Sequence, residues 1–322
     1  RFLDARITKP RLSNLMSYDW IKIICVIVAA IIALMLVFAV SETKPLSTQK
    51  FYVYAYTDVF EGENFGRLSD RLSGKNVFSY DILEVGSESF SASSGGSSVY
   101  QLRRNVGLGN VLFVTDEVIY QKDEEGNVVK DEDGNAVVEK NSTLCSMALG
   151  KSVASDEAEA GVAYDTVYYM DACERYLVQF FGDDWRTDDT FDGVLTPADS
   201  FSRNANDKRY KTDATRAQGL EDEKARLKKL REDYLVVDAA FDEGLLSHTC
   251  HEDENGNSSY PGINLSKLKS LRSLVYYNDS EDDSIITENL NLMLLFNSPL
   301  AHNDLRFESI SFLRYLVDTY KV

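Results

Sequence analysis

The sequence predicts an α/β protein with a single N-terminal transmembrane helix, followed by an extracytoplasmic domain that contains a parallel sheet and a largely helical middle insertion. Three observations lead to this prediction. An apolar run near the N-terminus is long enough to cross a membrane, strand and helix patterns alternate after it, and helical spacing dominates the middle of the chain.

The membrane segment is the first element. Every residue from Ile23 to Val40 is apolar, and about 20 such residues span the roughly 30 Å hydrocarbon core. Residues 1–22 carry five basic and two acidic side chains, whereas the remainder is strongly acidic, so the positive-inside rule places the N-terminus in the cytoplasm. We therefore expect a cytoplasmic tail at 1–22, a transmembrane helix at 23–40, a stem at 41–50 and an extracellular domain at 51–322 of a cell-membrane protein.

A cleaved secretory signal is the alternative for the same segment. Ala39 and Ser41 loosely fit a small-x-small cleavage site. Signal sequences usually have apolar runs of about 7 to 15 residues, shorter than this one, which favours an uncleaved anchor.

Strand and helix patterns alternate after the stem. β-Branched and aromatic residues predict strands, and apolar spacings of three and four predict helices. The order strand, helix, strand, helix, strand builds right-handed crossovers and a parallel sheet. The predicted elements are a strand at Phe51–Val59, a short helix ending near Leu72, a strand at Asn76–Val85, a loop at Ser87–Ser98, a helix through Val99, Leu102 and Val106 that Gly107 closes, and a strand at Val111–Tyr120.

A local duplication lies at residues 122–140, where KDEEGNVV is followed by KDEDGNAVV. Gly-Asn turns between β-branched residues predict a β-hairpin that protrudes from the sheet. Calcium binding is the functional alternative, because Asp131, Asp133 and Asn135 alternate around Gly134. The segment lacks the closing Glu of an EF-hand loop, so we expect an ordinary solvated turn.

Residues 145–250 are predicted to be mainly helical. A coiled-coil-like spacing of apolar residues in the second of two long helices is also explained by packing on the parent domain. The chain then returns to α/β character. The predicted elements are helices at Tyr164–Phe181 and Asp213–Leu246, the latter with its stripe at Leu220, Leu227, Leu230 and Tyr234, a loop at Glu254–Gly262, a helix near Leu265–Leu274, a strand at Asn289–Phe296, a turn at Asn297–Pro299 and a docked helix at Arg306–Tyr320.

The composition excludes several functional classes. The 322 residues include 52 Asp and Glu against 34 Lys and Arg, which gives a formal net charge of -18. Such a surface is unsuited to neutralising phosphates, so we expect no nucleic-acid partner. No P-loop, Gly-x-Gly-x-x-Gly, Gly-x-Ser-x-Gly or His-Glu-x-x-His motif is present. The sequence therefore predicts no cofactor and no catalytic residue, and we do not expect an enzyme.

His248, Cys250 and His251 form the one cluster of soft metal-ligand types. A structural zinc site needs four ligands, usually in two separated pairs, so no metal is predicted. Cys173 lies in an apolar stripe at helical spacing and is expected in the core. The sequence leaves open whether Cys145 pairs with Cys250 in a disulfide.

The candidate ligand-binding residues are Asp58, Asp116, Trp185 and Ser298. Ligands of open α/β sheets collect at the carboxyl ends of strands, and Asp58, Asp116 and Ser298 lie at or just beyond predicted strand ends. Trp185 is the only Trp of the predicted extracellular domain and lies in the acidic stretch GDDWRTDD, where its ring either stacks on a sugar or caps the core. Helix capping and turn formation are the alternative roles of the polar candidates.

Two segments resemble the extracytoplasmic solute-binding proteins of ABC transporters. Residues 100–116 (YQLRRNVGLGNVLFVTD) resemble the helix and acidic-ended strand of their first lobe, and residues 294–298 with 307–316 resemble the late strand and helix that rejoin that lobe. The resemblance implies one lobe of an α/β binding protein, a small solute as ligand and a transporter as partner. The integral anchor and the mostly helical middle section depart from that family.

These observations lead to one expected function and two alternatives. We expect a membrane-anchored, non-enzymatic, solute-binding-like protein that binds a small solute or docks on a membrane transporter partner. The first alternative is an anchored structural or assembly component of a cell-envelope complex, acting through protein contacts. The second is an envelope hydrolase with unidentified carboxylates. An apolar cleft near Asp58 and Asp116 would favour solute binding, and an exposed apolar patch would favour protein contacts.

Overall fold

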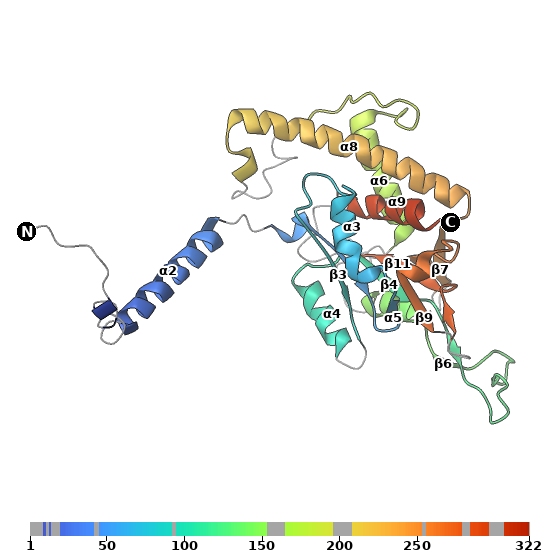
Figure 1. Cartoon of the computed structure of the whole chain (residues 1–322). Helices are drawn as coiled ribbons and strands as arrows, with labels where there is room; N and C mark the ends of the chain where they lie inside the picture. Colours follow the sequence, from blue (N-terminus) through green and yellow to red (C-terminus); the bar gives the residue numbers. More distant parts are fainter. Residues whose placement is uncertain are drawn as a thin grey trace, which may run out of the picture. The chain divides into compact units, whose positions relative to one another are not determined.

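The computed structural model describes residues 9–10, 13, 20–41, 45–91, 95–152, 165–195, 208–252, 256–278, 284–295 and 306–321. The chain divides into two compact units, Arg1–Lys44 and Pro45–Val322. The first unit contains the apolar helix, and the second contains every described strand (Figure 1).

The apolar segment of the first unit is one helix, α2 (Trp20–Ser41). Its stretch Trp20–Phe38 is long and apolar enough to cross a membrane, and none of it is buried in the protein. At about 1.5 Å per residue this stretch approaches the thickness of the hydrocarbon core. The predicted helix is confirmed and begins three residues earlier than expected. An N-terminal signal sequence can also form an apolar helix that meets this criterion.

Six strands form the main sheet of the second unit, in the order β3-β1-β4-β11-β8-β7. β3 and β4 flank β1 and run parallel to it, whereas β11 runs antiparallel to β4 and β8. The predicted parallel arrangement is confirmed for the first three strands, and the complete sheet is mixed. The strands are β1 (Lys50–Ala55), β3 (Glu84–Ser89), β4 (Val111–Thr115), β7 (Ser247–Glu252), β8 (Ser258–Asn264) and β11 (Leu290–Leu294).

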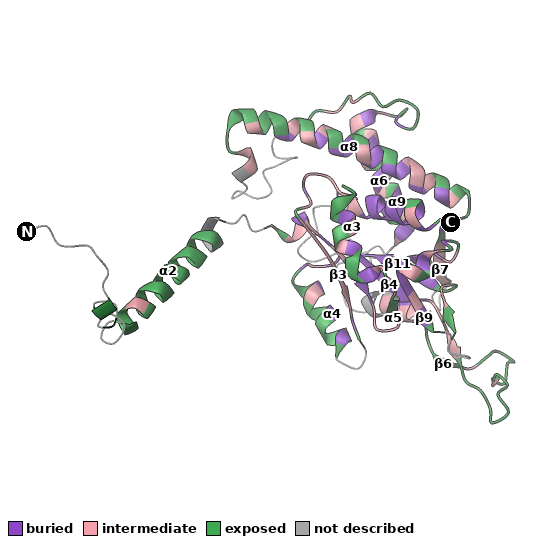
Figure 2. Cartoon of the chain, in the orientation of Figure 1, coloured by how far each residue is buried: buried purple, intermediate pink, exposed green. Residues whose placement is uncertain are grey.

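Helices cover both faces of this sheet. Side chains alternate between the two faces along a strand, so Phe51 and Val53 enter the large core, which also takes side chains from α3, α6, α8 and α9. Tyr54 enters a smaller cluster with Tyr100 of α4 and Leu144 of α5. Figure 2 shows buried positions along the sheet and the helices around it. The helices are α3 (Leu68–Gly74), α4 (Gly96–Asn105), α5 (Thr143–Ser152), α6 (Thr166–Phe181), α8 (Asp213–Asp242) and α9 (Glu308–Tyr320).

The long helices of the middle and C-terminal sections are confirmed. The carboxylate of Asp165 caps α6 by accepting the N–H of Tyr168 at 2.8 Å. Helix α8 buries Leu227, Leu230 and Tyr234 of the predicted stripe, and α9 docks through its predicted apolar face. Residues 182–195 contain no helix, so the section at 145–250 is less continuously helical than expected.

Several strand boundaries differ from the prediction. The first strand ends at Ala55 rather than Val59, and the second begins at Glu84 rather than Asn76. The third strand ends at Thr115 rather than Tyr120. Asn76 has a φ of 50°, in the left-handed region, which turns the chain after α3. The turns that follow bury Val77 without strand pairing. The Ser/Gly loop predicted from Ser87 begins later, because β3 continues to Ser89.

Helix α4 is present, but the face that it buries differs from the predicted one. Gly96, Tyr100 and Arg104 are buried, whereas the apolar residues that indicated the helix are exposed. The exposed fractions are 41% for Val99, 69% for Leu102 and 52% for Val106. We refer to these three residues as the α4 stripe.

The prediction for residues 247–274 is partly wrong. Strand β7 lies at the end of the section that was predicted to be mainly helical, and β8 replaces part of the predicted loop at Glu254–Gly262. The predicted helix at Leu265–Leu274 is a series of turns with a 3₁₀ segment at Leu271–Ser273. The β7–β8 pairing shifts register between Thr249 and His251. Pro261 lies within this register shift, where strand pairing is interrupted and a residue without an N–H is tolerated.

The duplicated segment forms the predicted hairpin, between β5 (Ile119–Tyr120) and β6 (Val138–Lys140). Asp131 Oδ1 accepts the N–H groups of Asp133 at 3.0 Å and Asn135 at 2.8 Å, and Asp123 folds the first copy in the same way. Asp131, one of the residues considered as a calcium ligand, therefore stabilises the turn through its own carboxylate. A further small sheet, which the sequence did not predict, contains β2 (Phe60–Glu61), β9 (Val275–Asn278) and β10 (Ile285–Ile286).

Candidate functional site

Asp58 lies where the strand order reverses. The chain passes from β1 to β3 on one side and then to β4 on the other, so the carboxyl ends of β1 and β4 flank the position at which α/β sheets bind ligands. Asp58 Oδ2 accepts the N–H of Thr115 at 3.2 Å and its hydroxyl at 2.6 Å. The other carboxylate oxygen is buried and has no hydrogen-bond partner among the described residues. The structure thus brings Asp58 to the end of β4, where one of its oxygens joins the two strands.

Asp116 holds two further segments at the same edge. Its Oδ1 accepts the hydroxyl of Ser142 at 2.6 Å and lies 2.9 Å from Nε2 of His251 on β7. Ser142 Oγ in turn accepts the N–H of Cys145 at 3.0 Å, which caps the start of α5. Asp116 therefore connects β4, α5 and β7.

This group does not have the geometry of a nucleophilic triad. In a triad the hydroxyl donates to the imidazole, and the imidazole donates to the carboxylate. Here the carboxylate receives both contacts, and Ser142 is fully buried. Burial and the charge of Asp116 raise the pKa of the Cys145 thiol, which keeps it protonated and weakly nucleophilic. The arrangement suits a structural role for these side chains.

The two histidines of the soft-ligand cluster contact different elements. His248 stacks on Phe241, with ring centroids 4.4 Å apart, and its Nδ1 lies 2.7 Å from the hydroxyl of Thr166. Burial lowers the pKa of His248. The second histidine, His251, contacts Asp116 instead. All four cysteines are free, so Cys145 and Cys250 are not paired. Among the described residues no group of three metal-ligating side chains is present.

Trp185 lies in the core. It is 2% exposed, its ring meets Tyr234 edge-on at 5.3 Å, and the Arg186 guanidinium lies 4.7 Å from the ring centroid. These contacts fit capping of the core, one of the two roles considered for Trp185, whereas stacking of its ring on a ligand stays a prediction. Ser298 lies outside the described residues.

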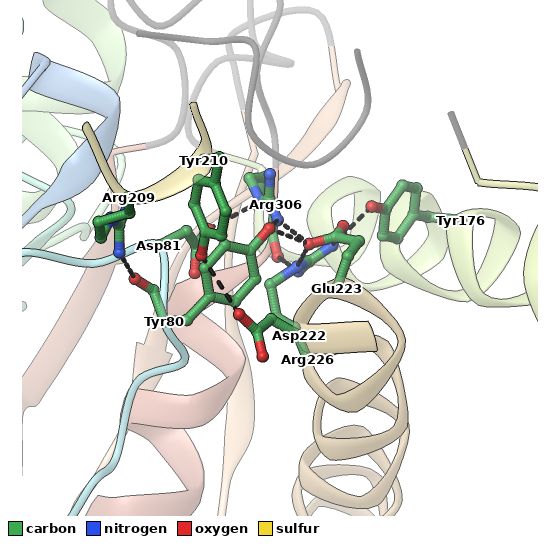
Figure 3. A network of polar contacts seen from close by, with 9 residues as sticks. All are labelled: Tyr80, Asp81, Tyr176, Arg209, Tyr210, Asp222, Glu223, Arg226 and Arg306. Carbon is green, nitrogen blue, oxygen red and sulfur yellow. Dashed lines mark hydrogen bonds and ion pairs between the residues drawn. The ribbon is translucent and has the colours of Figure 1, made fainter. Parts of the chain in front are cut away.

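A buried ionic network, which the sequence did not predict, joins α8 to the start of α9 (Figure 3). Arg226 donates to both carboxylate oxygens of Glu223, at 3.0 and 2.9 Å, and Arg306 donates to the same carboxylate. Arg306 Nε lies 2.8 Å from Asp81 Oδ2. Tyr80 also donates to Glu223, at 2.8 Å, and burial raises the pKa of its hydroxyl, which therefore stays protonated. Asp81, Glu223, Arg226 and Arg306 are all buried.

A small polar pocket adjoins this network. Asp81, Arg226, Arg306 and Glu308 line it together with Phe78 and other side chains. Phe307, at the first turn of α9, has a φ of 64°, which is uncommon for a bulky residue. Packing against Tyr169 and Tyr176, at 5.2 and 5.3 Å between ring centroids, holds this conformation. The pocket thus forms where three segments distant in the sequence meet around a strained turn.

The α4 stripe is a separate surface feature. Its helix docks through Gly96, Tyr100 and Arg104, and Arg103 pairs with Glu88 on β3. The stripe lies on another face of the helix, at spacings of three and four, which align side chains along one side.

Comparison of the chain with protein-family models, with curated proteins and with solved structures finds no match.

Proposed function

We propose that this chain is a single-pass membrane protein, non-enzymatic, whose α/β unit acts by binding another membrane protein through the α4 stripe. The supporting observation is the exposure of Val99 and Leu102 on α4 and of Val106 directly after it, while Gly96, Tyr100 and Arg104 of the same helix are buried. A contiguous exposed apolar surface is typical of a contact with another protein. In this proposal the N-terminus is cytoplasmic and residues 51–322 lie outside the cell.

The charge of the protein favours a partner other than a second copy. The chain has a formal net charge of -18, and two such copies repel one another. Helix α4 contains no acidic residue and carries Arg103 and Arg104. The proposed partner therefore presents an apolar surface, and its net charge is less negative than that of this chain.

Solute binding remains an alternative proposal. The resemblance to solute-binding proteins and the strand-order reversal beside Asp58 support it. However, Asp58 and Asp116 already hold Thr115, Ser142 and His251, which leaves these carboxylates fewer free acceptor positions for a ligand. A protein contact through the α4 stripe, in contrast, would bury apolar side chains that are exposed in this structure.

Photo-crosslinking from α4 tests the proposed partner contact. We expect a photoreactive residue at Leu102 or Val106 to give a discrete crosslinked product in intact membranes, because the stripe lies in the contact. The same residue at Gln101 or Asn105, which are exposed outside the stripe, should give little product. The products are measured by immunoblotting and mass spectrometry of the full chain.

Two results would contradict this proposal. A crosslinked product composed of two copies of the chain would show that the stripe mediates self-association and does not bind another membrane protein. Equal yields from Leu102 and Gln101 would show that the stripe has no preferred partner.

Cysteine labelling tests the proposed topology. Cys250 is exposed, whereas Cys145 is half-buried, Cys173 is buried and Cys25 lies in α2. We expect a membrane-impermeant maleimide to label intact cells and Cys250→Ser to remove most of that label. Labelling that appears only after permeabilisation would place the domain in the cytoplasm, and release of the protein by alkaline washing would contradict the anchor.

A further inference from the structure

The pocket at the start of α9 and the ionic network beside it together contain an imbalance of charge. Three carboxylates, Asp81, Glu223 and Glu308, meet the two guanidiniums of Arg226 and Arg306. If all five groups are ionised, the cluster carries one net negative charge. Because an uncompensated charge is costly to hold away from water, the cluster favours the uptake of one proton.

The contacts indicate which carboxylate takes this proton. Glu223 accepts from Tyr80, Arg226 and Arg306, and Asp81 lies beside Arg306 Nε. Such contacts favour the ionised form of a carboxylate. Glu308 has no ion pair or hydrogen bond to another side chain within the described part of the chain, although it lines the same pocket. Glu308 is therefore the group that neutralises the cluster.

We propose that Glu308, together with Asp81, forms a proton-binding site that stabilises the attachment of α9 to α8 and to the segment around Asp81 as the pH falls through neutrality. A solvent proton binds a Glu308 carboxylate oxygen and forms the neutral acid. The site responds to protons alone, and it is independent of the function proposed for α4.

The direction of the titration agrees with this geometry. Glu308 is half-buried, and its partial removal from water, followed by the negative charge of Asp81, raises the pKa of Glu308 to about 7. The folded state therefore holds a proton that the unfolded chain releases at about pH 4.3, the ordinary value for Glu. Between these two values the folded state binds more protons, so stability decreases as the pH rises through this window and levels off above it.

The other charged and titratable groups near Glu308 lie on α6, on α8 and in the segments around Asp81 and Arg306. On α6, burial raises the pKa values of Tyr169 and Cys173, which keeps both neutral. On α8 and before α9, Arg226 and Arg306 stay charged, and Glu223 is paired with them. The remaining neighbour, Asp81, is paired with Arg306. His248, whose pKa is lowered by burial, contributes stability that is lost as the pH falls, which is the opposite sign.

Thermal unfolding of the full chain in detergent micelles between pH 5.5 and 8.5 tests the site. We expect the melting temperature of the wild type to fall by several degrees relative to that of Glu308→Gln as the pH rises from 5.5 to about 7, and the difference to stay constant above pH 7, because glutamine mimics the neutral acid. Glu232→Gln, which changes an exposed carboxylate on α8, should follow the wild type. Asp81→Asn should move the transition to lower pH, because it removes the like charge beside Glu308.

Parallel pH profiles for the wild type and Glu308→Gln would overturn the proposal. Infrared difference spectroscopy gives a second readout that does not depend on stability. The wild type should show a protonated-carboxyl band that disappears as the pH rises through 7 and is missing in Glu308→Gln. A wild-type protein without such a band would also overturn the proposal.

Discussion

Replacing Arg306 with methionine should lower the free energy of unfolding by about 3–5 kcal/mol, the range observed when one partner of a buried ion pair is removed. Arg306 is buried and contacts both Glu223 and Asp81. Methionine fills part of the same volume but supplies no donor. Glu223 would keep Arg226 as its partner, whereas Asp81 would lose its only ion pair among the described residues.

Lys321→Met provides a matched control for this prediction. Lys321 also pairs with a glutamate, Glu243, at 3.0 Å, but both side chains are exposed, so removal of this pair should cost well under about 1 kcal/mol. Both variants are measured by denaturant unfolding at pH 6. Equal losses for the two variants would mean that burial of the network contributes nothing. In the double variant Arg306→Met with Asp81→Asn, the loss should be smaller than the sum of the single losses, because the orphaned charge has been removed.

Long periodic segments were the most predictable part of the fold. Helices α2, α6, α8 and α9 follow from sustained apolar patterns in the sequence. Strands β7 and β8 were missed because SHTCHE and SSYPGIN contain few apolar residues and a Pro-Gly pair. β7 lies at the edge of the sheet, where a strand needs less apolar surface than in the centre.

The buried face of α4 could not be read from spacing alone. Both the α4 stripe and the set Gly96, Tyr100 and Arg104 repeat at helical intervals, so either could face the sheet. Gly96 decides the orientation, because a Cβ there would lie 2.9 Å from Phe90 Cβ and 2.6 Å from the Ser91 carbonyl oxygen. Arg104 then reaches the carbonyl of Gly109 at 3.1 Å. These contacts join positions whose proximity depends on the folded chain.

The strand-end rule located Asp58 and Asp116 but not their partners. Ser142 and His251 reach Asp116 from segments far along the chain, which no local pattern connects to it. The ionic network left one signal in the sequence. Glu223 and Arg226 stand three residues apart on α8 and adjoin its buried stripe, and charged residues at such positions indicate a buried pair.

The second large effect is expected at Trp185, where replacement by alanine should lower the free energy of unfolding by about 3–5 kcal/mol. The indole is buried between Tyr234 and Arg186, so its loss removes contact area and leaves a cavity that neighbouring side chains fill only in part. The backbone is also constrained here, because the carbonyl of Trp185 accepts from Arg231 Nε. Trp185→Phe should lose less than half as much stability as Trp185→Ala, since phenylalanine keeps an aromatic ring against Tyr234.

Val194→Ala is the control for Trp185, because Val194 lies in the same irregular segment but is 86% exposed. Its replacement should change stability by less than about 0.5 kcal/mol, as is usual for surface positions. Denaturant unfolding followed by circular dichroism measures all three variants without depending on the indole as a probe. If Trp185→Ala were as stable as Val194→Ala, the indole would contribute no packing energy, and its assigned role in the core would be contradicted.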